Sequence, residues 1–359
     1  MSIGEPRFIN RERELSALKD FCSTSRALPL YIFGPEGCGK TRLLKEFVKE
    51  FNKYFNENGI AIYIDALERE SVNKALLTSP SIKISVDIIY SIVEKFTGIE
   101  VGRALANSIS SLLEKLIGRK RLKNKYILVA IDDVTRAIGL NKIEWYVKWL
   151  YELRWKLEEE YKPKAINFIV TTSEGISLDL ISKHRHSHPL LIWNLDRKAF
   201  KELFQELHPP NNIEFEDIWR LFGGNPRKLI ELAKQFKWNI REMLNLYEKK
   251  IKKLTDRIIR EGLVNELRLV IEDIDNLDKV KTKKMEILIN MLTDLNLILY
   301  KYWPTIHGED IAKDVELGIG KYYAWQIPAY KQVLQELLHR QNAMNKTLKH
   351  SMKALKDLK

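Results

Sequence analysis

Residues 30–41 read LYIFGPEGCGKT, an apolar run that leads directly into a glycine-rich loop. Residues 34–41 match the pattern G-x-x-x-x-G-K-[ST], in which two glycines, a lysine and a hydroxyl residue have fixed spacing. A helical pattern over residues 40–55 follows. The segment therefore predicts a buried strand, a phosphate-binding loop and a helix, in that order.

The residue types in this loop suit the triphosphate of a nucleotide. Glycines let backbone N–H groups converge on phosphate oxygens, and the following helix directs its positive N-terminus at the same oxygens. Lys40 is expected to reach the β- and γ-phosphates, and the Thr41 hydroxyl is expected to ligate Mg²⁺. The sequence therefore predicts ATP and Mg²⁺ as cofactors, and ATP hydrolysis as the reaction. The residues expected to contact the nucleotide in and directly after the loop are Gly34, Pro35, Glu36, Gly37, Cys38, Gly39, Lys40, Thr41 and Arg42.

Four further apolar runs resemble the one before the loop. They cover residues 60–66, 126–134, 167–173 and 190–195. Continuous apolar runs separated by helical stretches are typical of parallel strands that are covered on both faces. The predicted fold class is therefore α/β, with a parallel sheet.

Polar residues end two of these runs. Asp132 and Asp133 follow the run ILVAI, so their carboxylates are expected at the same edge of the sheet as the loop. Asp132 is expected to hold Mg²⁺, through water or directly, and Asp133 to orient or deprotonate the attacking water. The next run ends in Thr171, Thr172 and Ser173, where a polar side chain is expected to sense the γ-phosphate. Thr172 or Ser173 is favoured for this role, and a strand-terminal turn is the alternative.

The strand pattern stops after about residue 195, and helical segments follow. They are predicted over residues 196–207, 214–222 and 227–236, with Asp196 as the N-cap of the first. Residues 240 to about 303 are strongly helical and rich in lysine.

An aromatic, strand-like run at residues 322–327 precedes a last helix that starts at Pro328. Helices followed by a β-hairpin suggest a winged helix-turn-helix module. The predicted organisation is an ATPase core at residues 1–195, a helical lid at 196–239, a helical or winged-helix domain at 240–330 and a basic helical tail at 331–359.

Composition limits the remaining classes. The chain has 359 residues, a formal net charge of +12 and two cysteines. The length suits two or three domains, and two cysteines exclude a metal site built on cysteine. The positive charge favours polyanionic partners, although a Lys- and Glu-rich solvated surface of the kind common in hyperthermophiles explains it as well. Without an apolar run of about 18–20 residues or a signal peptide, a cytoplasmic protein with no membrane contact is expected.

These motifs together resemble the archaeal ATPase family, a branch of the STAND/AAA+-related P-loop ATPases. Residues 8–15, FINREREL, resemble the family's F-x-G-R-E-x-E-L, with Asn10 in place of the glycine. Asparagine tolerates a left-handed backbone, so the turn is expected to persist. Residues 223–227, GGNPR, resemble the family's lid motif G-G-x-P. The resemblance covers residues 7–235 well and the rest loosely.

The resemblance implies an additional-strand (ASCE) P-loop core, a helical lid and a C-terminal winged helix. It implies an ATP-driven switch in which Arg11 lies near the adenine, Pro226 belongs to the lid turn and Arg227 contacts the γ-phosphate. Arg185 follows the sensor strand, where related ATPases place a finger that reaches a neighbour's nucleotide. That role would require a homo-oligomer.

Two kinds of partner stay open. Basic clusters at residues 249–253 and 279–284 lie in the predicted winged-helix domain, where they would pair with the phosphates of double-stranded DNA. The same lysines serve equally well as a solvated face, in which case the switch would act slowly on a protein partner without nucleic acid. A small-molecule kinase is disfavoured, because no substrate-pocket signature accompanies the loop. GTP is disfavoured because the guanine-reading pattern N-K-x-D is only partly matched at residues 141–144, where Glu144 replaces the aspartate.

Overall fold

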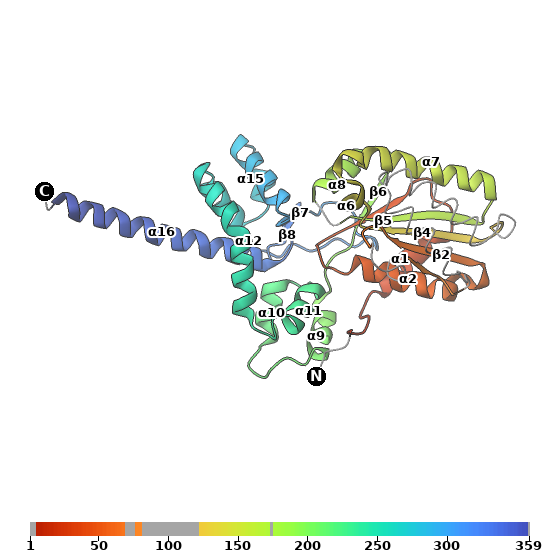
Figure 1. Cartoon of the computed structure of the whole chain (residues 1–359), viewed down its shortest axis with the longest axis horizontal. Coiled ribbons are helices and arrows are strands. Elements are labelled where there is room, and N and C mark those ends of the chain that lie inside the picture. The colour runs from red at the N-terminus through yellow and green to blue at the C-terminus, as the bar shows by residue number, and fades with distance from the viewer. Residues whose placement is uncertain (1–4, 69–75, 81–121, 173–174, 358–359) are drawn as a thin grey trace. The chain divides into compact units, whose positions relative to one another are not determined.

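The structure is a computed structural model of the chain (Figure 1), and it describes residues 5–68, 76–80, 122–172 and 175–357. Two compact units are present, and each is described by itself. The sheet unit comprises Asn10–Trp193 and Trp303–Asp310, and the helical unit comprises Met1–Ile9, Asn194–Tyr302 and Ile311–Lys359.

A mostly parallel sheet organises the sheet unit and confirms the predicted α/β class. The five predicted strands pair in parallel in the order β2-β4-β5-β1-β6, and the short β3 (Leu76–Thr78) adds antiparallel at the β2 edge. Because β5 lies between β1 and β4, it separates the strand that leads into the glycine-rich loop from the strand that ends in Asp132. This order is the additional-strand arrangement that the resemblance implied. The parallel strands are β1 (Leu30–Phe33), β2 (Gly59–Asp65), β4 (Tyr126–Asp132), β5 (Ala165–Thr171) and β6 (His188–Leu191).

Helices cover both faces of this sheet, with α1 and α2 on one face and α7 and α8 on the other (Figure 1). Phe47 and Phe51 of α2 are fully buried, as are Val147 and Leu150 of α7. The strands are apolar on both faces for this reason, as expected for a parallel sheet. The helices are α1 (Glu12–Cys22), α2 (Lys40–Phe55), α6 (Val134–Ile138), α7 (Ile143–Tyr161) and α8 (Gly175–Ser182), with short 3₁₀ turns at Asn56–Asn58 and Leu140–Lys142.

The helical unit begins with three short helices whose ends follow from local chemistry. The Asp196 carboxylate accepts the Ala199 N–H at 2.8 Å and caps α9, as predicted. Gly223 ends α10 in the left-handed conformation, and the Asn225 side chain caps α11. The helices of this unit are α9 (Arg197–Glu206), α10 (Phe215–Phe222), α11 (Pro226–Lys234), α12 (Ile240–Arg260), α13 (Val264–Glu272), α14 (Asn276–Lys279), α15 (Lys283–Asp294) and α16 (Pro328–Asp357).

A two-stranded sheet interrupts the region that was predicted to be helical up to about Trp303. Here β7 (Ile298–Tyr300) pairs antiparallel with β8 (Tyr323–Trp325), within the run predicted to be a strand. The helix predicted from Pro328 is present, but its first turns are buried at Ala329, Val333 and Leu334. The segment predicted as a separate tail from residue 331 therefore starts inside a packed helix.

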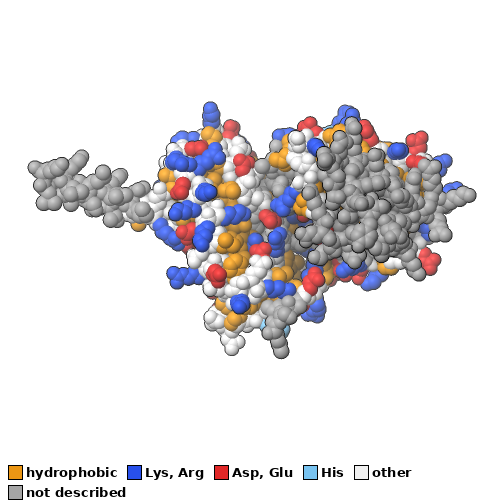
Figure 2. Space-filling view, in the orientation of Figure 1, with side chains coloured by type: hydrophobic (Ala, Val, Ile, Leu, Met, Phe, Trp, Pro, Cys, Tyr) orange, Lys and Arg blue, Asp and Glu red, His pale blue; other side chains and the backbone are white. Residues whose placement is uncertain are grey.

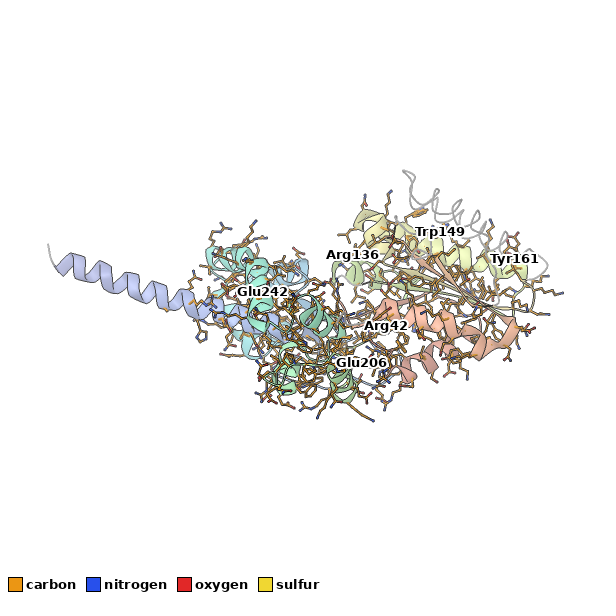
Figure 3. All side chains as sticks on the ribbon, turned by 60° about the horizontal axis from the view of Figure 1, so that its bottom comes forward. Arg42, Arg136, Trp149, Tyr161, Glu206 and Glu242 are labelled. Carbon is orange, nitrogen blue, oxygen red and sulfur yellow. The ribbon has the colours of Figure 1, made fainter. Side chains whose placement is uncertain are left out.

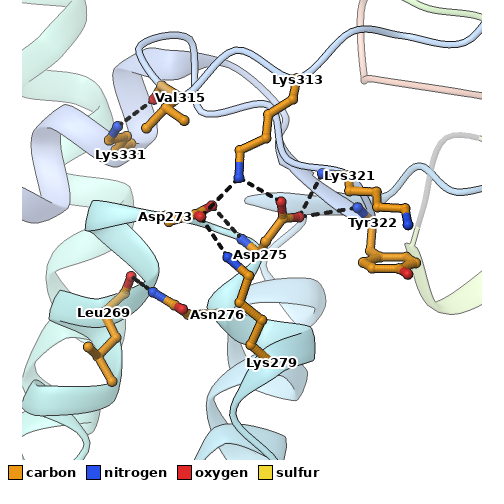
Figure 4. A network of polar contacts seen from close by, with 10 residues as sticks. All are labelled: Leu269, Asp273, Asp275, Asn276, Lys279, Lys313, Val315, Lys321, Tyr322 and Lys331. Carbon is orange, nitrogen blue, oxygen red and sulfur yellow. Dashed lines mark hydrogen bonds and ion pairs between the residues drawn. The ribbon is translucent and has the colours of Figure 1, made fainter.

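A polar network fixes the long connection between β7 and β8 (Figure 4). The Asp275 carboxylate accepts the backbone N–H groups of Lys321 and Tyr322 at 2.7 and 3.2 Å. The Lys313 ammonium lies 2.9 Å from both Asp275 and Asp273, and Lys279 also pairs with Asp273. Asp275 is almost fully buried, so these bonds hold the connection against the turn between α13 and α14.

This network predicts a pH-dependent part of the stability. Burial alone would raise the pKa of Asp273, but hydrogen bonds from Lys279 and Lys313 outweigh it and lower the pKa from 3.8 to about 2. A depressed carboxyl pKa stabilises the fold above the unfolded value, and that stability is lost as the pH falls through the folded value. We expect Asp273→Asn to cost about 1 kcal/mol at neutral pH, and the difference from wild type to shrink as the pH falls below 4 toward 2.

Urea denaturation curves at several pH values measure this difference. Asp278→Asn is the matched control, because Asp278 of α14 also pairs with a lysine, Lys281, but is more exposed than Asp273. A destabilisation by Asp273→Asn that stays constant down to pH 2 would contradict the expectation.

No helix within the described part of the chain is both long enough and apolar enough to span a lipid bilayer.

Candidate functional site

The glycine-rich loop connects β1 to α2 at the carboxyl edge of the sheet. Gly39 is the N-cap of α2 with a φ of 105°, and no side chain caps this helix end. Gly37 also has a positive φ, of 86°. The first N–H groups of a 16-residue helix are therefore available to an anion at the loop.

Gly34 fixes where the loop leaves the sheet. A Cβ at this position would lie 1.9 Å from the Ile192 carbonyl oxygen, so only glycine fits. The Ile192 N–H donates to the Phe33 carbonyl at 2.8 Å, which continues the pairing of β1 with the segment after β6. The start of the loop is thus packed tightly against the backbone that follows the edge strand.

Lys40 lies inside the curve of the loop. Its ammonium donates to the carbonyl oxygens of Gly34 and Pro35 at 3.0 and 3.2 Å, and the residue is only 8% exposed. The two carbonyl acceptors hold the ammonium in one place within the loop. The loop thereby presents one fixed cation together with the N–H groups of the helix start.

Arg11 contacts the backbone of the glycine-rich loop. Its guanidinium donates to the Cys38 carbonyl at 2.8 Å and to the Trp193 carbonyl at 2.9 Å, and it pairs with Glu14. The preceding Asn10 has a φ of 43°, the left-handed conformation predicted for it. Arg11 thus joins the loop backbone to the segment after β6, while its expected position beside an adenine stays a prediction.

Two hydroxyl groups orient the carboxylate of Asp132. The Tyr63 hydroxyl donates to Oδ2 at 2.7 Å, and the Thr171 hydroxyl donates to Oδ1. All three residues are nearly or fully buried. Burial raises the pKa of Tyr63, and the Asp132 charge raises it further, so the phenol stays protonated and remains a donor.

Tyr63 was missed by sequence reasoning, and Thr171 was ranked below its neighbours. The signal for Tyr63 was a hydroxyl inside an otherwise apolar strand, because a buried phenol usually finds a partner. Thr172 is also buried, and its N–H donates to the Ile32 carbonyl at 2.9 Å. Ser173, the favoured sensor, lies outside the described residues, so its role stays a prediction.

Asp133 lies directly after β4 in a left-handed conformation, with a φ of 50°. Its N–H donates to the Thr171 hydroxyl oxygen at 3.1 Å. Burial and the Asp132 charge raise the pKa of Asp133, while the cations of Arg136 and Lys40 oppose the rise. A carboxylate whose pKa is raised is a stronger proton acceptor, as a general base requires.

The oxygen atoms at this edge fit a magnesium ion. Mg²⁺ prefers oxygen ligands and is usually held by one or two protein groups, with phosphates and water completing its shell. Thr41 offers a hydroxyl and Asp132 a carboxylate whose two oxygens each retain a free lone pair after accepting one bond. Within the described ranges, no cluster of three or more His, Cys, Asp or Glu side chains is arranged to hold a metal by itself. The donor set therefore suits a metal that arrives with a nucleotide.

Two arginines lie at this end of the sheet unit. Arg42 follows Thr41 on α2 and Arg136 lies on α6, and Figure 3 shows both at the end of the unit opposite Tyr161. Arg185 is exposed on the segment between α8 and β6. Its expected role as a finger toward a neighbouring copy stays a prediction.

The turn at residues 223–227 belongs to the helical unit. Gly224 has a φ of 84°, and a Cβ there would lie 2.1 Å from the Leu195 carbonyl oxygen. The Leu195 N–H donates to the Gly224 carbonyl at 3.0 Å, and the Asn225 amide donates to the Asn194 side-chain oxygen at 3.1 Å. This turn is thus hydrogen-bonded to Asn194 and Leu195, the first residues of the helical unit after the sheet unit.

The last two predicted site residues follow this turn. Pro226 is the first residue of α11, where a missing N–H costs nothing. The Arg227 guanidinium donates to Glu231 at 2.9 Å and is more than half exposed. Their expected contact with a nucleotide stays a prediction.

Comparison with known proteins gives a family match and several relatives. A family described as an ATPase domain predominantly from Archaea matches residues 8–232. An uncharacterised ATP-binding protein of Methanocaldococcus jannaschii is 24% identical over 270 residues, which cover 65% of this chain and 72% of the relative. One from Pyrococcus abyssi is 24% identical over 286 residues, covering 71% and 79%. Among solved structures, the ORC2 protein of Aeropyrum pernix aligns over 93% of this chain and 97% of its own, with 16% identity and a TM-score of 0.39.

Proposed function

Because this chain belongs to the family of ATPase domains found predominantly in Archaea, we propose that it binds ATP with Mg²⁺ and hydrolyses it to drive a conformational switch. The observation that carries the proposal is the Asp132 carboxylate, held by Tyr63 and Thr171 at the edge of the sheet where the glycine-rich loop lies. Two neutral donors hold this carboxylate in one orientation, as a metal ligand requires.

Each residue at this edge has a role in the proposed reaction. The N–H groups of residues 34–41 bind the phosphates, and Lys40 leaves its loop carbonyls to contact the β- and γ-phosphates. Thr41 and Asp132 would hold the metal, which would neutralise charge on the phosphate oxygens. Asp133 orients or deprotonates the attacking water, and Ser173 senses the γ-phosphate.

The switch would use the turn at residues 223–227. This turn is bonded to Asn194 and Leu195, the first residues after the sheet unit. Two adjacent glycines with positive φ precede α11, and hinges are often a few such residues that absorb backbone rotation. ATP would favour one position of the lid helices and ADP the other, with Arg227 contacting the γ-phosphate in the first.

Arg227→Ala tests this role of the lid. We expect it to lower the affinity for ATP by about tenfold and to leave the affinity for ADP unchanged, because only ATP carries the γ-phosphate. Titration of both nucleotides by calorimetry measures the ratio. Lys234→Ala, on the same helix and beyond the turn, is the control. An unchanged preference for ATP over ADP in Arg227→Ala would leave this arginine as a surface residue paired with Glu231.

A second proposal, that double-stranded DNA is the partner, is favoured by the cations of the helical unit. Lys249, Lys252, Lys253 and Arg260 lie exposed along α12. Figure 2 shows Lys and Arg side chains spread over this side of the unit, with acidic side chains between them. Phosphate contacts of this kind would be sensitive to salt. The alternative is a slow switch that acts on a protein partner or on a second copy of the chain.

Phosphate release from ATP by the full chain tests the function and the partner together. We propose to measure it with and without double-stranded DNA, at low and moderate salt. Stimulation by DNA that fades with salt supports the nucleic-acid partner. Slow release that is indifferent to DNA supports the protein partner, and no metal-dependent release above the level of the Lys40→Ala variant would contradict the ATPase function.

A further inference from the structure

We propose that Tyr63 is a positioning residue for the metal site, and that its hydroxyl sets the orientation of the Asp132 carboxylate. The inference rests on the proposed function and deepens it, because it names a residue of the metal site outside the glycine-rich loop and the strand-terminal acids. Lys45, whose ammonium contacts the ring of Tyr63, is proposed to support this orientation.

The first support is the geometry around Asp132. The Tyr63 hydroxyl contacts Oδ2 at 2.7 Å, and the Thr171 hydroxyl contacts the other oxygen. One donor on each oxygen fixes the rotation of the carboxylate about its Cβ–Cγ bond. Mutation of a residue that orients a metal ligand in this way typically weakens metal affinity by about 10- to 100-fold.

The register of the sheet places Tyr63 for this contact. Strands β2 and β4 run in parallel, with Tyr63 opposite Ala130 and Asp65 opposite Asp132. The small side chain of Ala130 leaves the long phenol free to extend along the strands toward the carboxyl edge. A phenylalanine at this position would fill the same space but would leave Oδ2 without this donor.

Lys45 of α2 contacts the ring of Tyr63. The Lys45 ammonium lies 5.0 Å from the centre of the ring, a distance at which a cation is attracted to an aromatic face. Lys45 follows Thr41 by four residues, so both side chains lie on the same face of α2. Helix α2 therefore carries the proposed metal ligand Thr41 and, through Lys45, also contacts Tyr63, which orients the second ligand, Asp132.

The hydrogen bond from the Tyr63 hydroxyl to Asp132 does more than supply a partner for a buried hydroxyl. Tyr31 and Tyr146 are fully buried in the core that also contains Ile62 and Ile64, on the other face of the sheet from Tyr63, and their hydroxyls have no hydrogen-bond partner among the described residues. Within the described part of the sheet unit, a buried phenol is therefore not always hydrogen-bonded, and burial alone does not explain why the Tyr63 hydroxyl contacts Asp132. The same comparison supplies a matched control, because Tyr31→Phe also removes one buried hydroxyl.

The test measures metal binding directly, with Mn²⁺ as the probe for Mg²⁺. Full-length wild type, Tyr63→Phe and Tyr31→Phe are mixed with the non-hydrolysable analogue AMP-PNP, and free Mn²⁺ is followed by electron paramagnetic resonance. We expect Tyr63→Phe to weaken the binding of Mn²⁺ in the ternary complex by about 10- to 100-fold. Tyr31→Phe should match the wild type.

Two further measurements separate this role from other effects. Binding of AMP-PNP in the presence of a chelator should be equal in all three proteins, because the loop and Lys40 are untouched. Lys45→Met, which frees the ring but keeps the hydroxyl, should weaken Mn²⁺ binding less than Tyr63→Phe does.

Three outcomes would overturn the proposal or its premise. Wild-type affinity for Mn²⁺ in Tyr63→Phe would show that the hydroxyl does not position Asp132. An equal loss in Tyr31→Phe would assign the effect to the core. A wild-type protein that binds neither AMP-PNP nor Mn²⁺ with it would overturn the proposed function itself.

Discussion

Lys40→Ala is expected to lower the affinity for ATP and to reduce hydrolysis by at least about two orders of magnitude. Removing one preformed donor to a transition-state oxyanion typically costs about 10²–10³ in kcat. Here the lost group is a full charge that is buried within the loop and held 3.0 Å from the Gly34 carbonyl. Phosphate release and calorimetric titration with ATP measure the two effects separately.

The control for this change is Lys49→Ala. Lys49 lies on the same helix, pairs with Glu46 and is more than half exposed, so its removal should leave both quantities unchanged. Lys40→Ala also removes two hydrogen bonds to loop carbonyls, so thermal melting must confirm that the sheet unit stays folded. Full activity in a folded Lys40→Ala protein would place the nucleotide site elsewhere on the chain.

Asp133→Asn should separate binding from chemistry. Asparagine keeps the size of the side chain but cannot take a proton from water, and loss of a general base typically costs about 10²–10⁴ in rate. Binding of ATP should change little, because Asp132 and Thr41 remain as the proposed metal ligands. A large fall in kcat with a nearly constant affinity for AMP-PNP is the expected result.

Asp65→Asn is the matched control for Asp133→Asn. Asp65 ends the neighbouring strand opposite Asp132, and burial raises its pKa as it does for Asp133. Its carboxylate accepts the backbone N–H groups of Leu67 and Glu68, which asparagine also accepts. Unchanged turnover in Asp133→Asn, or an equal loss in Asp65→Asn, would remove Asp133 from the chemistry.

The parts of the site that could be predicted from the sequence are those whose residues are adjacent along the chain. The loop at residues 34–41 carries its glycines, lysine and threonine within one turn, and its position between β1 and α2 was predictable from the apolar run before it. The left-handed Asn10 and the cap at Asp196 are equally local. Their conformations depend on one or two residues, so the pattern was sufficient.

The parts that could not be predicted depend on pairing between distant segments. Tyr63 reaches Asp132 only because β2 and β4 pair in one particular register, and no local pattern specifies a register. Thr171 was ranked below Thr172 because the run was expected to continue to residue 173, whereas β5 ends at Thr171. The three residues of β7 were assigned to a helix, because so short a strand forms only through its partner β8.

The order in which the ribosome releases the chain gives the segment at residues 303–310 an unusual importance. The Leu191 N–H donates to the Pro304 carbonyl at 2.8 Å, and the Ile306 N–H donates back to the Leu191 carbonyl at 2.9 Å. This late segment therefore covers the open side of the edge strand β6, in a sheet whose strands were synthesised before it. Uncovered strand edges pair readily with other chains. A nascent chain, or a fragment that ends near residue 232, carries every residue of the glycine-rich loop and still leaves this edge free to recruit a neighbour.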